Sequence, residues 1–123
     1  MMSNSAASAY ARVATTTASP RDIEAQTLLK AANKLQDAIN SADPFSEQTT
    51  QALMFNRKLW TIFLSEAMRD TNPQPIDVRQ KIANISVFVL SQTAALQMSP
   101  QFDHFRPLIE INRNIAAGLS GRP

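Results

Sequence analysis

Apolar residues recur along most of this chain at the spacing of amphipathic helices, and prolines mark where the helical stretches end. Six prolines divide the sequence into four such stretches: Pro20, Pro44, Pro73, Pro75, Pro100 and Pro107. The only two glycines stand near the C-terminus, so the tight hairpin turns that favour glycine are not indicated. The pattern therefore predicts an all-α protein.

The first helix is predicted from Pro20 to about Ala42. Ser19 is a suitable N-cap, and Pro20 suits the first helical position. The apolar stripe of this helix is narrow and rich in alanine, which permits a neighbouring helix to approach closely. Its members are Leu28, Ala31, Ala32, Leu35, Ala38, Ile39 and Ala42.

The second helix is predicted from Glu47 to about Arg69, with Ser46 as its N-cap. Its apolar residues cover well over half of the helix circumference, which is too much for a helix that buries one face only. They are Leu53, Phe55, Leu59, Trp60, Ile62, Phe63, Leu64, Ala67 and Met68.

The third helix is predicted from Ile76 to about Gln97, and it is apolar on two sides. Its main stripe consists of Val78, Ile82, Ile85, Val89, Thr93 and Leu96, and its second stripe of Ala83, Val87, Leu90 and Ala94. The second stripe is either covered by the fourth helix or the N-terminal arm, or left open as a groove for a foreign amphipathic helix. The fourth helix is predicted to begin near Pro107, with Leu108, Ile111, Ile115 and Leu119 on one face.

Short connections between four helices predict a single-domain, mostly antiparallel bundle. We expect the helices at 47–69 and 76–97 to form its centre and the other two to cover them. The domain is expected to span residues 19–123. Residues 1–18 are rich in Ala, Ser and Thr, and their composition predicts a mobile N-terminal arm.

Four residues of the second and fourth helices are candidate partner contacts: Asn56, Arg57, Trp60 and Asn112. The two asparagines lie in or beside apolar stripes, so they either bond to neighbouring helix ends and fix the register of the bundle or clamp the backbone of a partner. Trp60 suits the core better than a binding hot spot, because its helix is densely apolar.

Composition argues against catalysis. The chain has no Cys and a single His, its glutamates are scattered over different helices, and neither phosphate-binding motif, GxxxxGK(S/T) or GxGxxG, occurs in it. No catalytic, metal or cofactor site is therefore predicted, and the protein is not expected to be an enzyme.

Charge and hydropathy narrow the possible partners. The net charge is +2, and no run of Lys or Arg exceeds the pair Arg57–Lys58, so neither a basic patch nor direct nucleic-acid binding is expected. Residues 82–102 are uncharged but contain many polar side chains, so membrane insertion is not expected. The N-terminal residues lack the apolar stretch of a signal peptide, which favours a cytoplasmic protein.

Four blocks of the chain resemble the FlaF family of flagellar biosynthesis regulators. They are residues Ala18–Ala32, Phe55–Phe63, Val78–Val89 and Leu108–Leu119, and the likeness extends over nearly all of residues 6–119. The resemblance implies a role in flagellum assembly in alphaproteobacteria. FlaF-type proteins are required for flagellin production or export and act opposite FlbT-type proteins, which restrain flagellin synthesis.

The resemblance also implies the partners. Flagellin is expected to bind through an amphipathic terminal segment laid into a helical groove, which makes the protein a flagellin chaperone. A FlbT-type protein is the second expected partner. The alternative is a post-transcriptional regulator or adaptor that acts with FlbT on flagellin mRNA.

Overall fold

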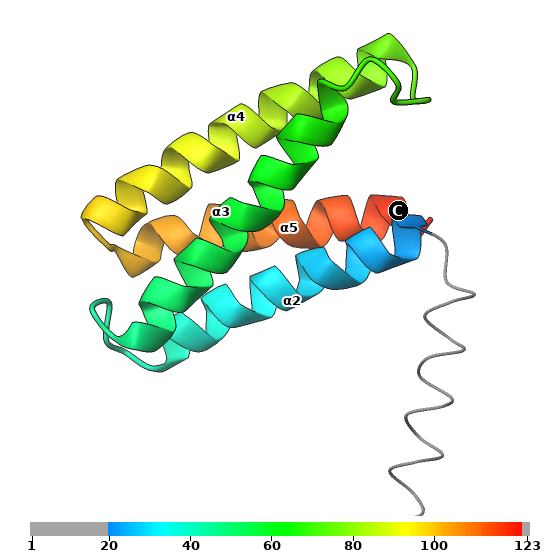
Figure 1. Cartoon of the computed structure of the whole chain (residues 1–123). Coiled ribbons are helices and arrows are strands. Elements are labelled where there is room, and N and C mark those ends of the chain that lie inside the picture. The colour runs from blue at the N-terminus through cyan, green and yellow to red at the C-terminus, as the bar shows by residue number, and fades with distance from the viewer. Residues whose placement is uncertain (1–19, 122–123) are drawn as a thin grey trace, which may run out of the picture.

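The structure, a computed structural model, describes residues 20–121, and these residues form a bundle of four α-helices (Figure 1). In chain order the helices are α2 (Pro20–Asn40), α3 (Glu47–Ala67), α4 (Ile76–Met98), the 3₁₀ turn η1 (Phe102–His104) and α5 (Phe105–Leu119). The predicted all-α fold is confirmed. The predicted N-terminal arm and the predicted N-cap Ser19 lie outside the described residues.

The boundaries of α2 and α3 are set by local hydrogen bonds. Ala42 adopts a left-handed backbone conformation with φ of 62°, so α2 ends two residues before the predicted position. Ser46 is the N-cap of α3, as predicted, because its Oγ accepts a hydrogen bond of 3.1 Å from the Thr49 N–H. The Thr49 hydroxyl in turn donates to the carbonyl of Asp43 at 2.9 Å, which ties the connecting loop to the helix.

The last helix begins at Phe105 rather than near Pro107, because η1 leads directly into it. Pro107 then occupies the first turn of α5. Backbone N–H groups in that turn have no intrahelical acceptor, so the proline removes no helical hydrogen bond. The earlier start also places the fully buried Phe105 ring in the core.

The helices pack as two close pairs, α2 with α5 and α3 with α4, and α3 also packs on α2 (Figure 1). The prediction that α4 lies at the centre is wrong. α4 buries four side chains, whereas α2 buries six, four of which are alanines that let α5 and α3 approach closely. α4 is therefore a peripheral helix that rests mainly on α3.

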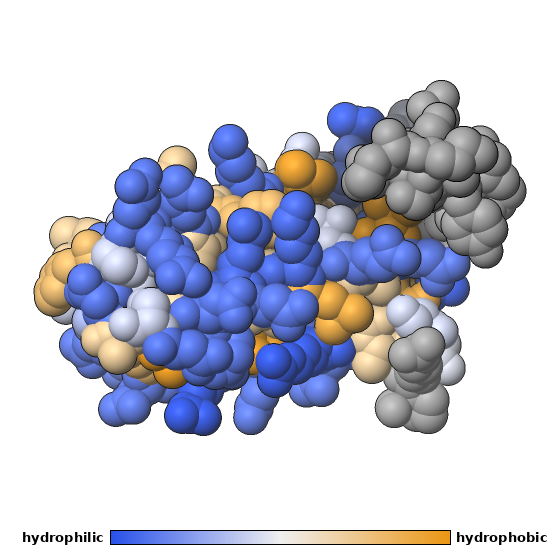
Figure 2. All heavy atoms as spheres, turned by 90° about the horizontal axis from the view of Figure 1, so that it is seen from below, coloured by the Kyte–Doolittle hydropathy of each residue, from blue (hydrophilic) through white to orange (hydrophobic). Residues whose placement is uncertain are grey.

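The core follows the predicted stripe of α2, but only one residue of the predicted α5 stripe, Leu108, is buried in it. The other three stripe residues, Ile111, Ile115 and Leu119, are half-buried, and α5 instead buries Phe105, Ile109, Asn112 and Ala116. Leu28 and Leu35 of α2, Leu108 of α5 and Val89 of α4 are completely buried. The outer face of α2 is largely hydrophilic, as the view from that side shows (Figure 2). One side of α2 therefore holds the bundle together and the other is solvated.

We expect Leu28→Ala to lower the free energy of unfolding by about 2–5 kcal/mol, because it opens a cavity where α2 enters the core. Its neighbour Leu29 is 43% exposed, so Leu29→Ala is a matched control with an expected loss below about 1 kcal/mol. Urea unfolding measures both values. Equal losses in the two variants would contradict the assigned face of α2.

Candidate partner-binding groove

A chain of buried hydrogen bonds joins α5, α3 and α4. Trp60 Nε1 donates to Asn112 Oδ1 at 2.9 Å, and Asn112 Nδ2 donates to Asn56 Oδ1 at 2.8 Å. Asn56 Nδ2 then donates to Thr93 Oγ1 at 3.2 Å, and the Thr93 hydroxyl donates to the carbonyl of Val89 at 2.7 Å. None of these side chains is more than 1% exposed.

The chain of hydrogen bonds corrects one expectation. Asn56 and Asn112 were expected either to bond to neighbouring helix ends or to clamp the backbone of a partner, but they bond to each other and to the side chains of Trp60 and Thr93. Within residues 20–121 no buried side-chain nitrogen or oxygen lacks a partner. Because a displaced helix would leave several of these groups unpaired in the interior, the chain specifies how α4 and α5 sit on α3.

An apolar groove lies between α4 and α5, which meet at η1 and then diverge (Figure 1). We call it the α4–α5 groove, and its apolar walls are Ile82, Ile85 and Phe88 of α4 and Ile111, Ile115 and Leu119 of α5. Trp60 and Phe63 of α3 close its deeper end, which holds a volume of about 60 Å³, and the shallower end holds about 340 Å³. Asn84 and Asn114 line the shallower end.

A ring contact and a buried hydrogen bond hold Trp60 at the deep end of the α4–α5 groove. The Trp60 and Phe63 rings meet edge to face with centroids 5.2 Å apart, a favourable aromatic geometry. The Trp60 nitrogen is held by Asn112, so the ring cannot rotate without breaking a buried hydrogen bond. At the shallow end Phe88 is 49% exposed, so it is available for contact.

Glu24 of α2 lines the deep end of the groove, and among residues 20–121 it is the only charged residue of the groove lining. Desolvation raises the pKa of the Glu24 carboxyl above its ordinary value of 4.5. Arg21 opposes this rise by favouring the carboxylate, while the negative charge of Glu66 adds to it. A carboxyl group in this position is a hydrogen-bonding group beside the apolar side chains of the deep end.

The predicted second stripe of α4 does not line the α4–α5 groove. Ala83, Leu90 and Ala94 are half-buried on the same side of α4 as Arg79 and Gln97. Those two residues bond to α3, through the carbonyl of Ala67 and the side chain of Arg57, so this side of α4 faces α3. Val87, at the edge of the stripe, is 57% exposed.

The other predicted contact residues fall in two environments. Asn56, Trp60 and Asn112 are buried in the bundle, where they support the groove from within. Arg57 lies on the outer surface of α3, and its Nη1 donates to Gln97 Oε1 at 2.9 Å. The walls of the groove were not singled out from the sequence, because the spacing of Ile82 and Ile85 assigned both residues to the core stripe.

Two further properties describe residues 20–121. They contain no group of three His, Cys, Asp or Glu side chains placed to hold a metal ion, and His104 is exposed. None of their helices combines the length and the hydropathy needed to cross a membrane.

The fold and the groove together define a small four-helix protein with an apolar groove between two of its helices. The family model described as "Flagellar protein FlaF" matches residues 6–119. The chain therefore belongs to the FlaF family, a family of flagellar accessory proteins that is not a known enzyme family. No curated protein and no solved structure matches the chain.

Asn112→Leu is expected to lower the free energy of unfolding by about 2–4 kcal/mol, because it leaves the Trp60 N–H and Asn56 Oδ1 without partners in the core. Asn114→Leu, on the exposed side of the same helix, is the control and is expected to change stability by less than about 0.5 kcal/mol. The chain has one Trp, so its single indole N–H resonance reports the broken bond directly. An unmoved resonance in Asn112→Leu would exclude the assigned hydrogen bond.

Glu24→Gln tests the electrostatics of the groove. Because the raised pKa means that the folded state binds the proton more tightly than the unfolded chain, stability of the natural protein falls as pH rises through 4.5 towards the raised value. The glutamine variant lacks this loss, so we expect it to gain stability relative to the natural protein between about pH 4 and pH 7. Urea unfolding across this pH range measures the difference, and parallel pH profiles would contradict the raised pKa.

Proposed function

We propose that this protein is a flagellin-binding chaperone required for flagellin production and export, and that the α4–α5 groove holds an amphipathic terminal helix of flagellin. Membership of the FlaF family supports the flagellar role. The observation that carries the binding mode is the groove itself, whose walls are six apolar side chains on two diverging helices.

The dimensions of the groove fit about two turns of a partner helix. Ile82 and Phe88 are six residues apart and Ile111 and Leu119 eight, which correspond to ~9 and ~12 Å along their helices. A partner helix of that length presents two or three apolar anchors at the i, i+3 and i+4 spacing.

The expected affinity is moderate. Each apolar anchor contributes about 1.5–3 kcal/mol when fully buried, and the ordering of a disordered chain end offsets part of that gain. A short groove therefore holds its cargo without preventing release, and release is what export of a flagellin chain requires.

The competing hypothesis is a regulator or adaptor that acts with a FlbT-type protein on flagellin mRNA. In the part of the chain that the structure describes, no Lys or Arg lines the α4–α5 groove, and the one charged residue of the lining, Glu24, is acidic. Phosphate groups require cations, so the groove suits an apolar helix better than RNA. Salt dependence separates the two hypotheses, because added salt weakens RNA binding strongly and apolar binding little.

Phe88→Asp is expected to abolish co-purification with flagellin, because it places a charge in the apolar wall where the partner helix contacts it. The adjacent Val87→Asp is the matched control. Val87 is as exposed as Phe88 but lies outside the groove lining, so this variant is expected to retain flagellin. Co-purification with full-length and end-truncated flagellin, followed by size-exclusion chromatography, measures both outcomes.

The pair of variants also decides between the groove and the predicted stripe of Ala83, Val87, Leu90 and Ala94. Loss of flagellin in Val87→Asp with retention in Phe88→Asp would move the binding site to that stripe. Circular dichroism is the control measurement that tests whether each variant is folded. Retention of flagellin in both variants would exclude both surfaces.

A further inference from the structure

Two stretches of the chain, one in α2 and one in α3, contain basic residues but no acidic ones, and the two helices pack against each other. Residues 25–36 of α2 and 48–65 of α3 contain Lys30, Lys34, Arg57 and Lys58 but no Asp or Glu. The acidic residues flank these stretches, as Glu24, Asp37, Glu47 and Glu66 show. Because α2 packs against α3, the packing brings Lys30 and Lys34 of α2 to the same side of the bundle as the pair Arg57–Lys58 of α3, which is distant in the sequence.

Two of the four cations are held in place by an aromatic ring. The Nζ atoms of Lys30 and Lys34 lie 5.6 and 5.2 Å from the centre of the Phe55 ring, within the range of cation–π attraction. Arg57 is held at the opposite edge of α3 by its hydrogen bond to Gln97. Within residues 20–121, the ion pair between Arg69 and Glu66 does not involve any of these cations.

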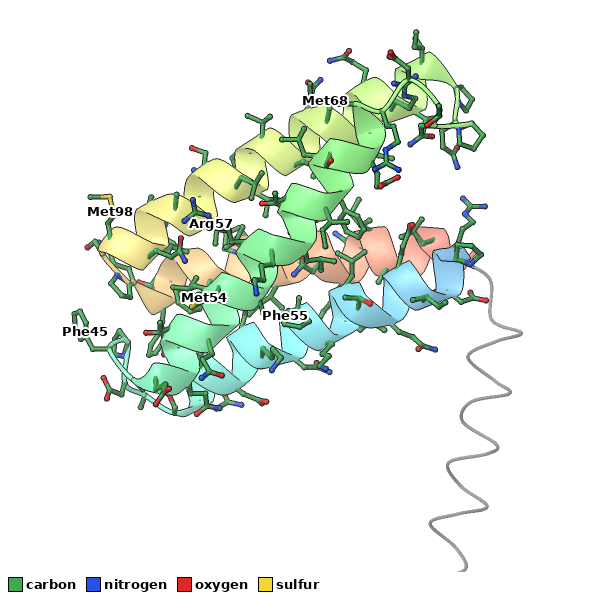
Figure 3. All side chains as sticks on the ribbon, viewed as in Figure 1. Phe45, Met54, Phe55, Arg57, Met68 and Met98 are labelled. Atoms are coloured by element: carbon green, nitrogen blue, oxygen red, sulfur yellow. The ribbon has the colours of Figure 1, made fainter. Side chains whose placement is uncertain are left out.

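Exposed apolar side chains lie among the cations. Met54 and Ile62 of α3 are 49% and 58% exposed, and they are eight residues apart, which places them on the same side about two turns from each other. Lys58 stands midway between them. A shallow hollow runs past these residues to Gln97 of α4, and the labelled Met54, Phe55 and Arg57 lie along this part of α3 (Figure 3).

We propose that this surface, consisting of Lys30, Lys34, Met54, Arg57, Lys58 and Ile62, is a second binding site, and that its partner is an acidic amphipathic helix of another protein. The apolar side chains of the helix contact Met54 and Ile62. Its flanking carboxylates pair with Lys58 in the middle and with the cations at the two edges. This α3 surface is separate from the α4–α5 groove, so it binds a partner other than the helix held there.

The composition of the α3 surface favours a protein over RNA or a membrane. RNA-binding surfaces offer aromatic faces on which bases stack, but the Phe55 ring is half-buried and has two lysines over it. A membrane-binding helix presents large apolar side chains along its whole exposed face. Here two exposed apolar residues stand a full two turns apart with a lysine between them, which matches the spacing of anchors on a single helix.

The test uses the full chain and a fluorescein-labelled 18-residue peptide with leucines at i, i+4 and i+8 and glutamates around them. A second peptide with glutamine in place of every glutamate shows how much of the binding affinity depends on the negative charge of the peptide. Fluorescence anisotropy is expected to give at least about tenfold tighter binding of the acidic peptide at 50 mM salt. Raising the salt to 500 mM shortens the screening length from ~14 to ~4 Å and is expected to remove most of that difference.

Variants locate the binding. Lys58→Glu is expected to weaken binding of the acidic peptide about tenfold, and Ile62→Ser is expected to weaken binding of both peptides. Phe88→Asp, in the α4–α5 groove, is the control and is expected to leave acidic-peptide binding unchanged while Lys58→Glu leaves flagellin binding unchanged. Loss of acidic-peptide binding in Phe88→Asp, together with loss of flagellin binding in Lys58→Glu, would assign one common site to both partners and overturn the proposal.

Single-stranded RNA and anionic lipid vesicles are the competing probes. Tighter binding of either one than of the acidic peptide, lost in Lys58→Glu, would overturn the proposal in favour of that class of partner. Equal binding of the acidic and the glutamine peptides at 50 mM salt would also overturn it, because the cations would then play no part.

Discussion

The arrangement of the bundle depends on the buried hydrogen bonds that run from Trp60 through Asn112 and Asn56 to Thr93. Apolar packing alone tolerates small rotations and shifts of a helix, because dispersion contacts have no direction. Asn56 lies on α3 with Asn112 on α5 at one side and Thr93 on α4 at the other, so each of these two helices has one position that satisfies the amide. The α4–α5 groove exists because that position holds α4 and α5 apart beyond η1.

The groove also depends on the alanines of α2. Ala31, Ala32 and Ala38 are completely buried, and their small side chains let α5 and α3 lie close to α2. α4 has no such close contact with α2 or α5 and packs mainly on α3. The side of α4 that carries Ile85 and Phe88 consequently receives no full cover from α5. Half-buried isoleucines on both walls follow from this imbalance between a tight pair of helices and a helix beside it.

The sequence predicted the helices and the buried face of α2, but not the rotation of α4 and α5. Apolar spacing and caps located the helices, because both signals are local: Ser46 caps α3, and Leu28 and Leu35 face the core. The spacing of α4 indicated two apolar sides without indicating which one a neighbour covers. That choice is made by distant contacts, such as Arg57 with Gln97 and Asn56 with Thr93. For the same reason the spacing of Lys and Arg along the sequence did not indicate the cationic surface. That surface combines residues of two different helices, such as Lys30 of α2 and Lys58 of α3.

The two proposed sites use opposite sides of one helix. Phe63 closes the deep end of the α4–α5 groove, while Lys58, five residues earlier, lies on the outer surface of α3, and five residues correspond to a rotation of ~140° about the helix axis. A partner on one side therefore does not block the other. The two surfaces also differ in chemistry, since one is apolar with a single carboxyl at its end and the other carries four cations. Because the two proposed sites differ in both position and chemistry, they suit two different partner chains held at the same time.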